Sequence, residues 1–234
     1  MNHKTIISFL LIVAALAPTA GFAKEKKESW KDNLSPTAEQ YSSTGRNTYF
    51  ILEPGYQLVL EGEEDGKKTI LTITVLNETK KIGDVETRVI EENEKVDGKV
   101  VEISRNYFAI GVDTKNAYYF GEDVDVYKDG KVIHEGSWHA SENGAKHGIM
   151  IPGQVKVGDR YYQERAPKVA LDRGENISIT ETVKTPGGDF KNCLKVKETT
   201  PIESGSEYKL YAPQVGLVVE GELKLVKYGF VKKP

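Results

Sequence analysis

The sequence predicts an all-β, antiparallel fold, and three observations carry this prediction. Short segments alternate apolar and polar residues with the period of two that half-buried strands show. Asp-Gly pairs stand between such segments at 65–66, 97–98 and 129–130, and Asp-Gly readily takes the two positive φ angles of a type I′ hairpin turn. No segment carries apolar residues at the i, i+3, i+4, i+7 spacing of an amphipathic helix.

Residues 1–23 have the layout of a cleaved signal peptide for export. One lysine, Lys4, precedes an apolar run from Ile6 to Ala17, and small residues then lead to Ala23. The apolar run is shorter than the about 20 residues that a bilayer-spanning helix needs. We therefore expect a periplasmic or secreted protein without a transmembrane segment.

Residues 24–46 are rich in charge, Ser, Thr and Pro, which predicts a flexible lead-in with at most a short helical turn near Trp30. We expect a single β domain over residues 47–234. Its expected strands are rich in β-branched and aromatic residues and include the runs "YQLVLEG", "TILTITVL", "NISITETV", "CLKVKET", "EYKLYA" and "ELKLVKY".

Two parts of this domain, about 47–121 and 149–228, are predicted to be an internal repeat. "GDVETRV" aligns with "GDFKNCL", so that Gly83 matches Gly188, and a Pro-Gly pair opens each half. Duplicated units of this kind usually complete one shared core. The expected architecture is two related halves that form one half-barrel or sandwich-like domain.

The net charge and the single cysteine narrow the class of protein further. The formal net charge is −3 and becomes about −4 without the signal peptide, which disfavours a nucleic-acid partner because such partners select strongly basic faces. Cys193 has no second cysteine to pair with, so packing alone must stabilise the fold. Alternation predicts a partly buried strand thiol there, with an intermolecular disulfide as the alternative.

Several longer runs resemble an uncharacterised family of exported bacterial β-rich proteins. These runs are "YYFGEDVDVYKDGKVIHEGSW", "PGQVKVGDRYYQE", "TVKTPGGDFKNCLKVKETTP" and "EYKLYAPQVGLVVEGEL", the last with a closing Tyr-Ala-Pro-x-Val-Gly-Leu-Val motif. The resemblance covers about residues 49–228, although Gln214 stands where the motif usually has glycine and Leu210 where it has an aromatic residue. It implies an exported envelope protein and implies no activity and no catalytic residue.

The stretch "HEGSWH" lies close to the zinc-protease signature H-E-x-x-H but does not match its geometry. His134 and His139 are five residues apart, which splays them by about 140° on a helix and sends them to opposite faces of a strand. A looser metal site stays open, since Zn or Cu accepts imidazole and carboxylate ligands. Its candidate ligands are His134, His139, His147 and Glu142. The alternative is that these histidines are solvated side chains of a loop.

The aromatic residues suggest a binding face, since Tyr has an apolar body and a polar tip. The chain has 12 Tyr against 7 Phe, although Tyr is also favoured by ordinary packing on a half-buried sheet. The candidate ligand-binding residues are Tyr107, Tyr118, Tyr119, Tyr161, Tyr162, Tyr211 and Trp138.

The sequence contains no G-x-S-x-G, P-loop or G-x-G-x-x-G motif, and the spacing of "GEDVDVYKDG" does not fit a calcium-binding EF-hand loop. We therefore expect a non-enzymatic envelope protein, without a resident cofactor, that binds an amphipathic small molecule or an envelope protein. Two alternatives remain: a periplasmic metal-binding protein that uses the histidines, and a hydrolase whose carboxylates assemble only in space.

Overall fold

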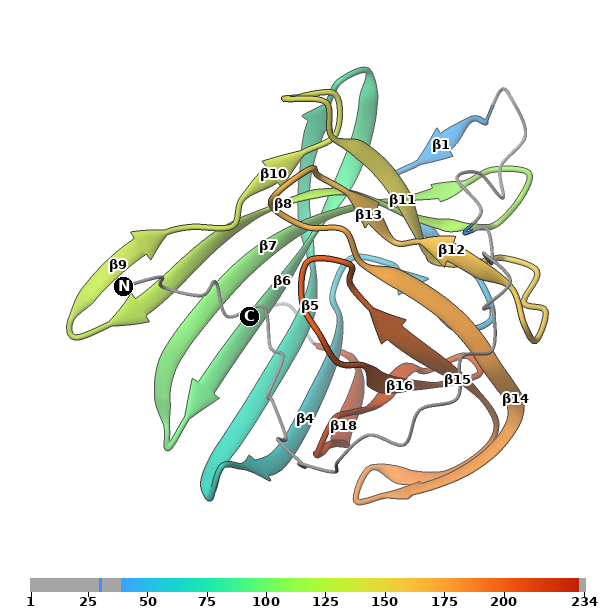
Figure 1. The fold of residues 1–234 in the computed structure, drawn as a ribbon. Coiled ribbons are helices and arrows are strands. Elements are labelled where there is room, and N and C mark those ends of the chain that lie inside the picture. The colour runs from blue at the N-terminus through green and yellow to red at the C-terminus, as the bar shows by residue number, and fades with distance from the viewer. Residues whose placement is uncertain (1–29, 31–38, 232–234) are drawn as a thin grey trace, which may run out of the picture.

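The computed structural model describes Trp30 and residues 39–231, and every regular element among them is a β-strand (Figure 1). In the first part of the chain the strands are β1 (Tyr41–Ser42), β2 (Gly45–Arg46), β3 (Ile51–Leu52), β4 (Tyr56–Glu64), β5 (Lys67–Ile82), β6 (Val85–Val96), β7 (Lys99–Gly111) and β8 (Ala117–Lys128). In the second part they are β9 (Lys131–His134), β10 (Trp138–His139), β11 (Lys146–Ile151), β12 (Arg160–Tyr162), β13 (Glu164–Arg165), β14 (Arg173–Thr185), β15 (Gly188–Thr199), β16 (Glu207–Ala212), β17 (Gly216–Glu220) and β18 (Leu223–Phe230).

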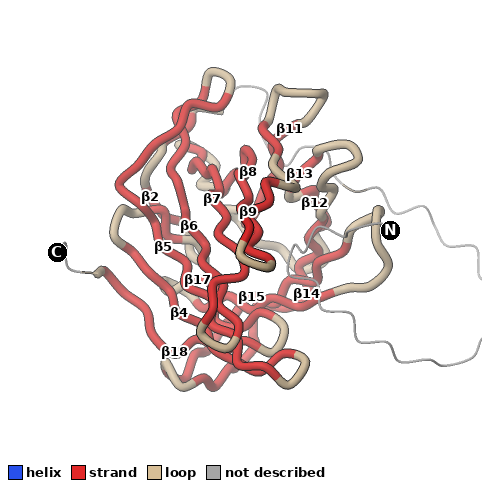
Figure 2. The backbone as a smooth tube through the Cα atoms, turned by 90° about the vertical axis from the view of Figure 1, so that its left-hand side faces the viewer, coloured by secondary structure: helices blue, strands red, loops and turns tan. Residues whose placement is uncertain are grey.

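Sixteen of these strands form one antiparallel sheet, and β2 pairs separately with β3. The main order is β12-β14-β15-β16-β17-β18-β4-β5-β6-β7-β8-β11-β13, with β1, β9 and β10 added beside it. The strands β4–β8 form one wall and β14–β16 lie across from them (Figures 1 and 2). The predicted all-β antiparallel fold is therefore confirmed.

The sheet continues further round than a half-barrel and nearly closes on itself. The two strands that end the order, β12 and β13, are separated in the chain only by Gln163. The backbone N–H of Gln163 donates to the carbonyl of Asp172 at 2.8 Å, just before β14 begins. One short stretch of chain thus pairs with both edges of the sheet, which leaves little exposed strand edge.

The three Asp-Gly hairpins are confirmed, each with a positive φ at both central residues. Each pair connects two strands that leave only these two residues between them, as the two-residue type I′ turn requires. The φ angles are 50° and 72° at Asp65-Gly66, 50° and 77° at Asp97-Gly98, and 52° and 74° at Asp129-Gly130.

The predicted lead-in is wrong at its C-terminal end, where residues 41–46 form β1 and β2. Tyr41 pairs with Gly111 on β7, and its ring packs edge-on against Tyr118 with the centroids 5.2 Å apart. An aromatic side chain in a polar stretch is enough to dock this segment, because its burial removes a large apolar surface from water. Trp30 also has contacts, since the guanidinium carbon of Arg173 lies 4.4 Å from its ring centroid. The predicted signal peptide and the residues flanking Trp30 lie outside the described residues.

The two predicted repeat halves both contribute strands to the one sheet, and β18 joins them by pairing with β4. Whether the halves are related stays a prediction. Cys193 is fully buried in β15, more than the partly buried thiol that alternation predicts. Asn192, with φ 56°, interrupts the regular strand just before it. Among the described residues, no helix is long and apolar enough to cross a membrane.

Candidate functional site

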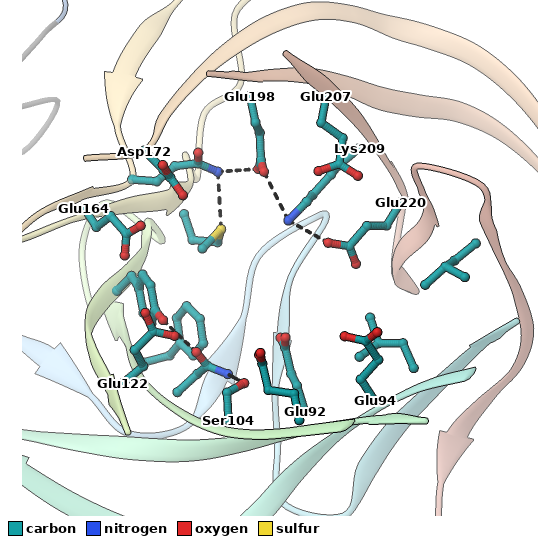
Figure 3. A pocket seen from close by; sticks show the side chains of 18 residues that line it. Glu92, Glu94, Ser104, Glu122, Glu164, Asp172, Glu198, Glu207, Lys209 and Glu220 are labelled. Carbon is teal, nitrogen blue, oxygen red and sulfur yellow. Dashed lines mark hydrogen bonds and ion pairs between the residues drawn. The ribbon is translucent and has the colours of Figure 1, made fainter. Parts of the chain in front are cut away.

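The two walls of the sheet enclose a cavity lined by nine carboxylates and one lysine (Figure 3). The space not filled by protein atoms is about 980 Å³, a volume that includes open solvent at the mouth of the cavity. Strands β6, β7 and β8 supply Glu92, Glu94, Glu102 and Glu122. The facing elements supply Glu164, Asp172, Glu198, Glu207 and Glu220, together with Lys209. We call this space the acidic cavity.

Strand alternation places the carboxylates of β6 and β7 on the inner face. Glu92 and Glu94 are two residues apart and so point to the same side of β6. In the register of the two strands, Glu94 lies directly opposite Glu102, and Glu92 lies opposite Ser104. Like charges directly opposite each other destabilise a sheet. The Glu94–Glu102 pair therefore costs stability, which is a feature typical of binding sites rather than of cores.

A bulge in β8 turns Glu122 into the same cavity. Asn106 pairs with Glu122 and Phe108 with Tyr119, so β8 has one more residue than β7 between these pairs. Strict alternation from Tyr119 would send Glu122 outward, and the extra residue reverses this. Gly121 lies at the bulge with φ 141°, and a Cβ there would come within 2.3 Å of the Trp138 carbonyl. Only glycine fits this position.

Among the described residues, Lys209 is the one cation that lines the acidic cavity, and it is held by two carboxylates. Its Nζ lies 2.8 Å from Glu220 and 3.1 Å from Glu198. Burial alone would lower the pKa of Lys209, but Glu198 and Glu220 outweigh this and hold the pKa well above its usual value. Lys209 is thus paired with Glu198 and Glu220. The described residues that line the cavity include no second lysine or arginine to pair with the other carboxylates.

Glu164 is the most deeply buried carboxylate of the set and has an unpartnered oxygen. Its side chain is 4% exposed and points into the acidic cavity (Figure 3). Oε2 makes no hydrogen bond of normal geometry to a described residue, although the Asp172 carboxyl group lies close enough to raise the pKa of Glu164. A second buried acceptor without such a hydrogen bond, Oε1 of Gln163, belongs to a residue that lines the same cavity. Unpaired buried acceptors are costly, so each calls for a donor.

The pKa values of the cavity carboxylates are shifted upward wherever a shift is resolved. Burial, with the charges of Glu94 and Glu122, raises the pKa of Glu102 to about 8. Burial likewise raises the pKa of Glu122 to about 8 and those of Glu92 and Glu207 to about 7. Burial and the neighbouring Asp172 hold the pKa of Glu164 well above its usual value. Near neutral pH the cavity therefore holds several carboxyl groups as neutral acids.

A second, apolar cavity adjoins the acidic one and has about 690 Å³ of empty space, again counted out to solvent. The two share the lining residues Glu92, Phe108, Met150, Lys209 and Glu220. The other lining residues of this apolar cavity include Tyr49, Tyr56, Leu58, Ile73, Val75, Ile90, Tyr211 and Leu217.

Polarity changes in the same direction along three strands of the enclosure. The inner face of β6 passes from Ile90 to Glu92 and Glu94, and that of β7 from Phe108 through Asn106 and Ser104 to Glu102. On β16 it passes from Tyr211 to Lys209 and Glu207. The interior is therefore amphipathic, with an apolar end and an acidic end.

Only two of the seven predicted aromatic residues line these cavities. Tyr119 lines the acidic cavity and Tyr211 the apolar one. Trp138 packs edge-on behind Tyr119, with the ring centroids 5.3 Å apart. The other four make contacts away from both cavities: Tyr107 bonds to Asp123, Tyr118 bonds to Asn116, Tyr161 bonds to Asn176, and Tyr162 lies against Trp30.

The predicted metal ligands lie in three different surroundings. His134 is exposed and pairs with Asp125 at 2.5 Å. His139 lies 2.9 Å from Asp123 and 3.4 Å from Glu142. His147 is half-buried, and its ring stacks on Phe120 with the centroids 4.7 Å apart.

All three histidines lie on strands (β9, β10 and β11), so the interpretation of solvated loop side chains is wrong for His139 and His147. Within the described part of the chain, no group of three or more His, Cys, Asp or Glu side chains is arranged to hold a metal ion. The structure thus adds no support for Zn or Cu at these residues.

The carboxylates of the acidic cavity are not among the predicted site residues, although the sequence contains a signal for several of them. Glu92 and Glu94 share the alternation of Ile90, and Glu102 shares that of Phe108. Following each strand past its apolar residues would have placed these charges on the inner face. Glu122 could not be found in this way, because the bulge breaks the alternation.

Comparison of the chain with models of protein families, with curated proteins and with solved structures finds no match.

Proposed function

We propose that this protein is a non-enzymatic binding protein that holds an amphipathic small molecule inside its sheet. The single observation that carries the proposal is the junction of an apolar cavity with an acidic one, bridged by Phe108 and Met150. Ligand pockets are typically concave and largely apolar, with a few convergent polar groups. Export to the periplasm or beyond remains part of this proposal on the basis of residues 1–23.

The alternative function for a cavity lined by carboxylates is that of a hydrolase. Acid–base catalysis by two carboxyl groups needs environments that push their pKa values apart, so that one group stays protonated and the other ionised. The adjoining apolar cavity gives a hydrocarbon group a place to bind, and this supports binding over hydrolysis.

The proposal can be tested with N-phenyl-1-naphthylamine, an apolar fluorophore that is uncharged at neutral pH. We expect saturable binding at one site, with displacement by at least one ten-carbon amphipath. Ile73→Trp, which fills the apolar cavity, should abolish the signal because Ile73 lines it. Val132→Trp is the matched control, since Val132 is 46% exposed on β9 and lines neither cavity. Equal binding by both variants, or no saturable binding by the unmodified protein, would contradict the proposal.

A further inference from the structure

The acidic end of the enclosure restricts the chemistry of the ligand's head group. Two features set it apart from an ordinary cluster of surface acids. The deeply buried Glu164 points into it with an unpartnered oxygen (Figure 3), and its neighbour Gln163 has a second unpartnered acceptor. Oε1 of Gln163 can only accept a hydrogen bond, and Oε2 of Glu164 accepts one when its carboxyl group is ionised, so a group that donates hydrogen bonds satisfies both atoms.

We propose that the ligand is an amphipathic organic amine, whose protonated amino group donates hydrogen bonds to Glu164 and the facing carboxylates while its hydrocarbon part lies in the apolar cavity. This inference rests on the proposed function and names its ligand class. An ammonium group supplies three donors and no acceptor. An anionic head group such as a carboxylate would add one more negative charge to nine carboxylates and one lysine.

The adjoining apolar cavity favours an organic cation over a bare metal ion. A metal ion would gain nothing from Leu58, Ile73 or Tyr211, whereas a hydrocarbon chain gains about 25 cal/mol for each Å² removed from water. The described residues also present no group of three or more carboxylates or other ligands placed to hold a metal.

Binding of the amine expels protons from the acidic cavity. The titratable groups that face the cavity from β6, β7 and β8 are Glu92, Glu94, Glu102, Tyr119 and Glu122. Those that face it from the opposite side are Glu164, Asp172, Glu198, Glu207, Lys209 and Glu220. The raised pKa values of Glu92, Glu102, Glu122 and Glu207, about 7 to 8, keep part of this set protonated at neutral pH. A bound ammonium lowers these pKa values, and each neutral carboxylic acid that ionises becomes a carboxylate and releases one proton to solvent.

Isothermal titration calorimetry with four probes of equal chain length tests the inference. The probes are decylamine, decyltrimethylammonium, decanol and decanoate, and each titration is made in two buffers of different ionisation enthalpy. At pH 7 we expect decylamine to bind at least about 10-fold more tightly than the other three, with release of about one proton per ligand. At pH 9 we expect tighter binding and much less proton release, because the carboxyl groups with a pKa of about 7 to 8 are then largely ionised.

Two carboxylate variants locate the head group. Glu164→Gln and Glu94→Gln should each weaken decylamine binding by about 10-fold or more while leaving decanol unchanged. Two variants are used because substitution of the buried Glu164 can also affect folding, and thermal unfolding of each variant measures that effect. Glu63→Gln is the control, since Glu63 is exposed on β4 and lines neither cavity.

The outcomes separate this inference from the proposed function. If decanol or decanoate binds as tightly as decylamine, the protein is a binding protein but the amine inference is wrong. If decyltrimethylammonium equals decylamine, the hydrogen bonds to Glu164 play no part and the inference fails on that point. Displacement of decylamine by micromolar Ca²⁺ would make the cavity a metal site and overturn the inference. If none of the four probes binds, the proposed function itself fails.

Discussion

Glu94 on β6 lies directly opposite Glu102 on β7, and both side chains line the same cavity. Two like charges in this position repel each other across the strands. The sheet tolerates them because protons can occupy the carboxylates when no cation is present. The unliganded protein should therefore depend on pH in a direction opposite to that of proteins with salt-bridged acids.

The first prediction is that stability of the unliganded protein falls as pH rises from about 5 to 9. In the folded state the pKa of Glu102 is about 8, above the usual value of 4.5. A raised carboxyl pKa means that the folded state binds more protons than the unfolded state. Its contribution to stability is therefore complete below pH 4.5 and is lost as pH rises through 8.

Glu102→Gln removes one of these charges and so should stabilise the protein at pH 9. We expect a gain on the order of 1 kcal/mol, or about 2–4 °C in melting temperature, because the cavity is open to solvent and screens part of the repulsion. At pH 5 the variant and the unmodified protein should melt together. Glu63→Gln serves as the exposed control at both pH values. An equal effect of Glu102→Gln at pH 5 and pH 9 would show that charge repulsion is not the cause.

The second prediction concerns the one lysine that lines the acidic cavity. Lys209→Met should destabilise the protein by about 3 kcal/mol at pH 8, since it leaves Glu198 and Glu220 buried without their cation. At pH 5 the loss should be smaller, because both carboxylates can take up a proton. Urea unfolding at the two pH values measures the difference. Lys224→Met, exposed on β18, should have little effect at either pH, and a similar loss in both variants would count against the argument.

The strand pattern predicted the fold well because its signals are local. An Asp-Gly pair such as Asp97-Gly98 fixes a hairpin turn by its own φ preferences, whatever packs around it. The inside of the sheet could not be predicted in the same way. Alternation tells that Ile90, Glu92 and Glu94 share a face, but only closure of the sheet decides that this face is enclosed. The usual rule that charged side chains face solvent then predicts the wrong surroundings for Glu92 and Glu94.

The histidines show that local sequence also fails to predict the surroundings of a single side chain. "HEGSWH" and "ASENGAKHG" look like loops because they contain Gly, Ser and Asn and show no alternation, yet His139 and His147 lie on short strands added to β8. Which polar residue is buried depends on partners distant in sequence, here Asp123 for His139 and Phe120 for His147. No local pattern carries that information.

A third prediction follows from this placement of the histidines. His147→Ala should lower stability by roughly 2 kcal/mol at pH 7.5, because it removes a ring stacked on Phe120 and close to the Tyr41 hydroxyl. His134→Ala should change it by less than about 0.5 kcal/mol, since that side chain is 76% exposed. Thermal unfolding in chelator-containing buffer measures both. Equal effects of the two substitutions would show that the ring of His147 is not packed as described.

His147 also affects the stability of the protein at acidic pH. Burial and then the charge of Arg165 lower the pKa of His147, so the folded state disfavours its protonation. The stability associated with the neutral ring is present above the usual pKa of 6.5 and is lost as pH falls below it. His147→Phe keeps a stacked ring without a titrating group. The stability of this variant relative to the unmodified protein should therefore increase as pH falls from 6.5 to 5, and an unchanged difference between the two would show that His147 is not the titrating group.

The last prediction concerns a variant in which a lysine of the chain takes the place of the ligand's ammonium group. Met150 lines both cavities, and its Sδ accepts a hydrogen bond from Nε2 of Gln163 at 3.4 Å. In Met150→Lys the stem of the lysine can lie along apolar side chains while its ammonium group reaches the carboxylates. We expect this variant to lose less stability than the unmodified protein between pH 5 and 9, and to bind decylamine at least about 10-fold more weakly.

Met150→Leu is the matched control, since it keeps the volume and apolar character of the side chain without adding charge. It should retain both the pH dependence and the binding of decylamine. If Met150→Lys destabilised the protein at every pH and still bound decylamine, an ammonium group at the junction of the two cavities would not be neutralised by the carboxylates. Together the two variants thus test whether the carboxylates of the acidic cavity bind a positive charge, independently of which natural amine the protein binds.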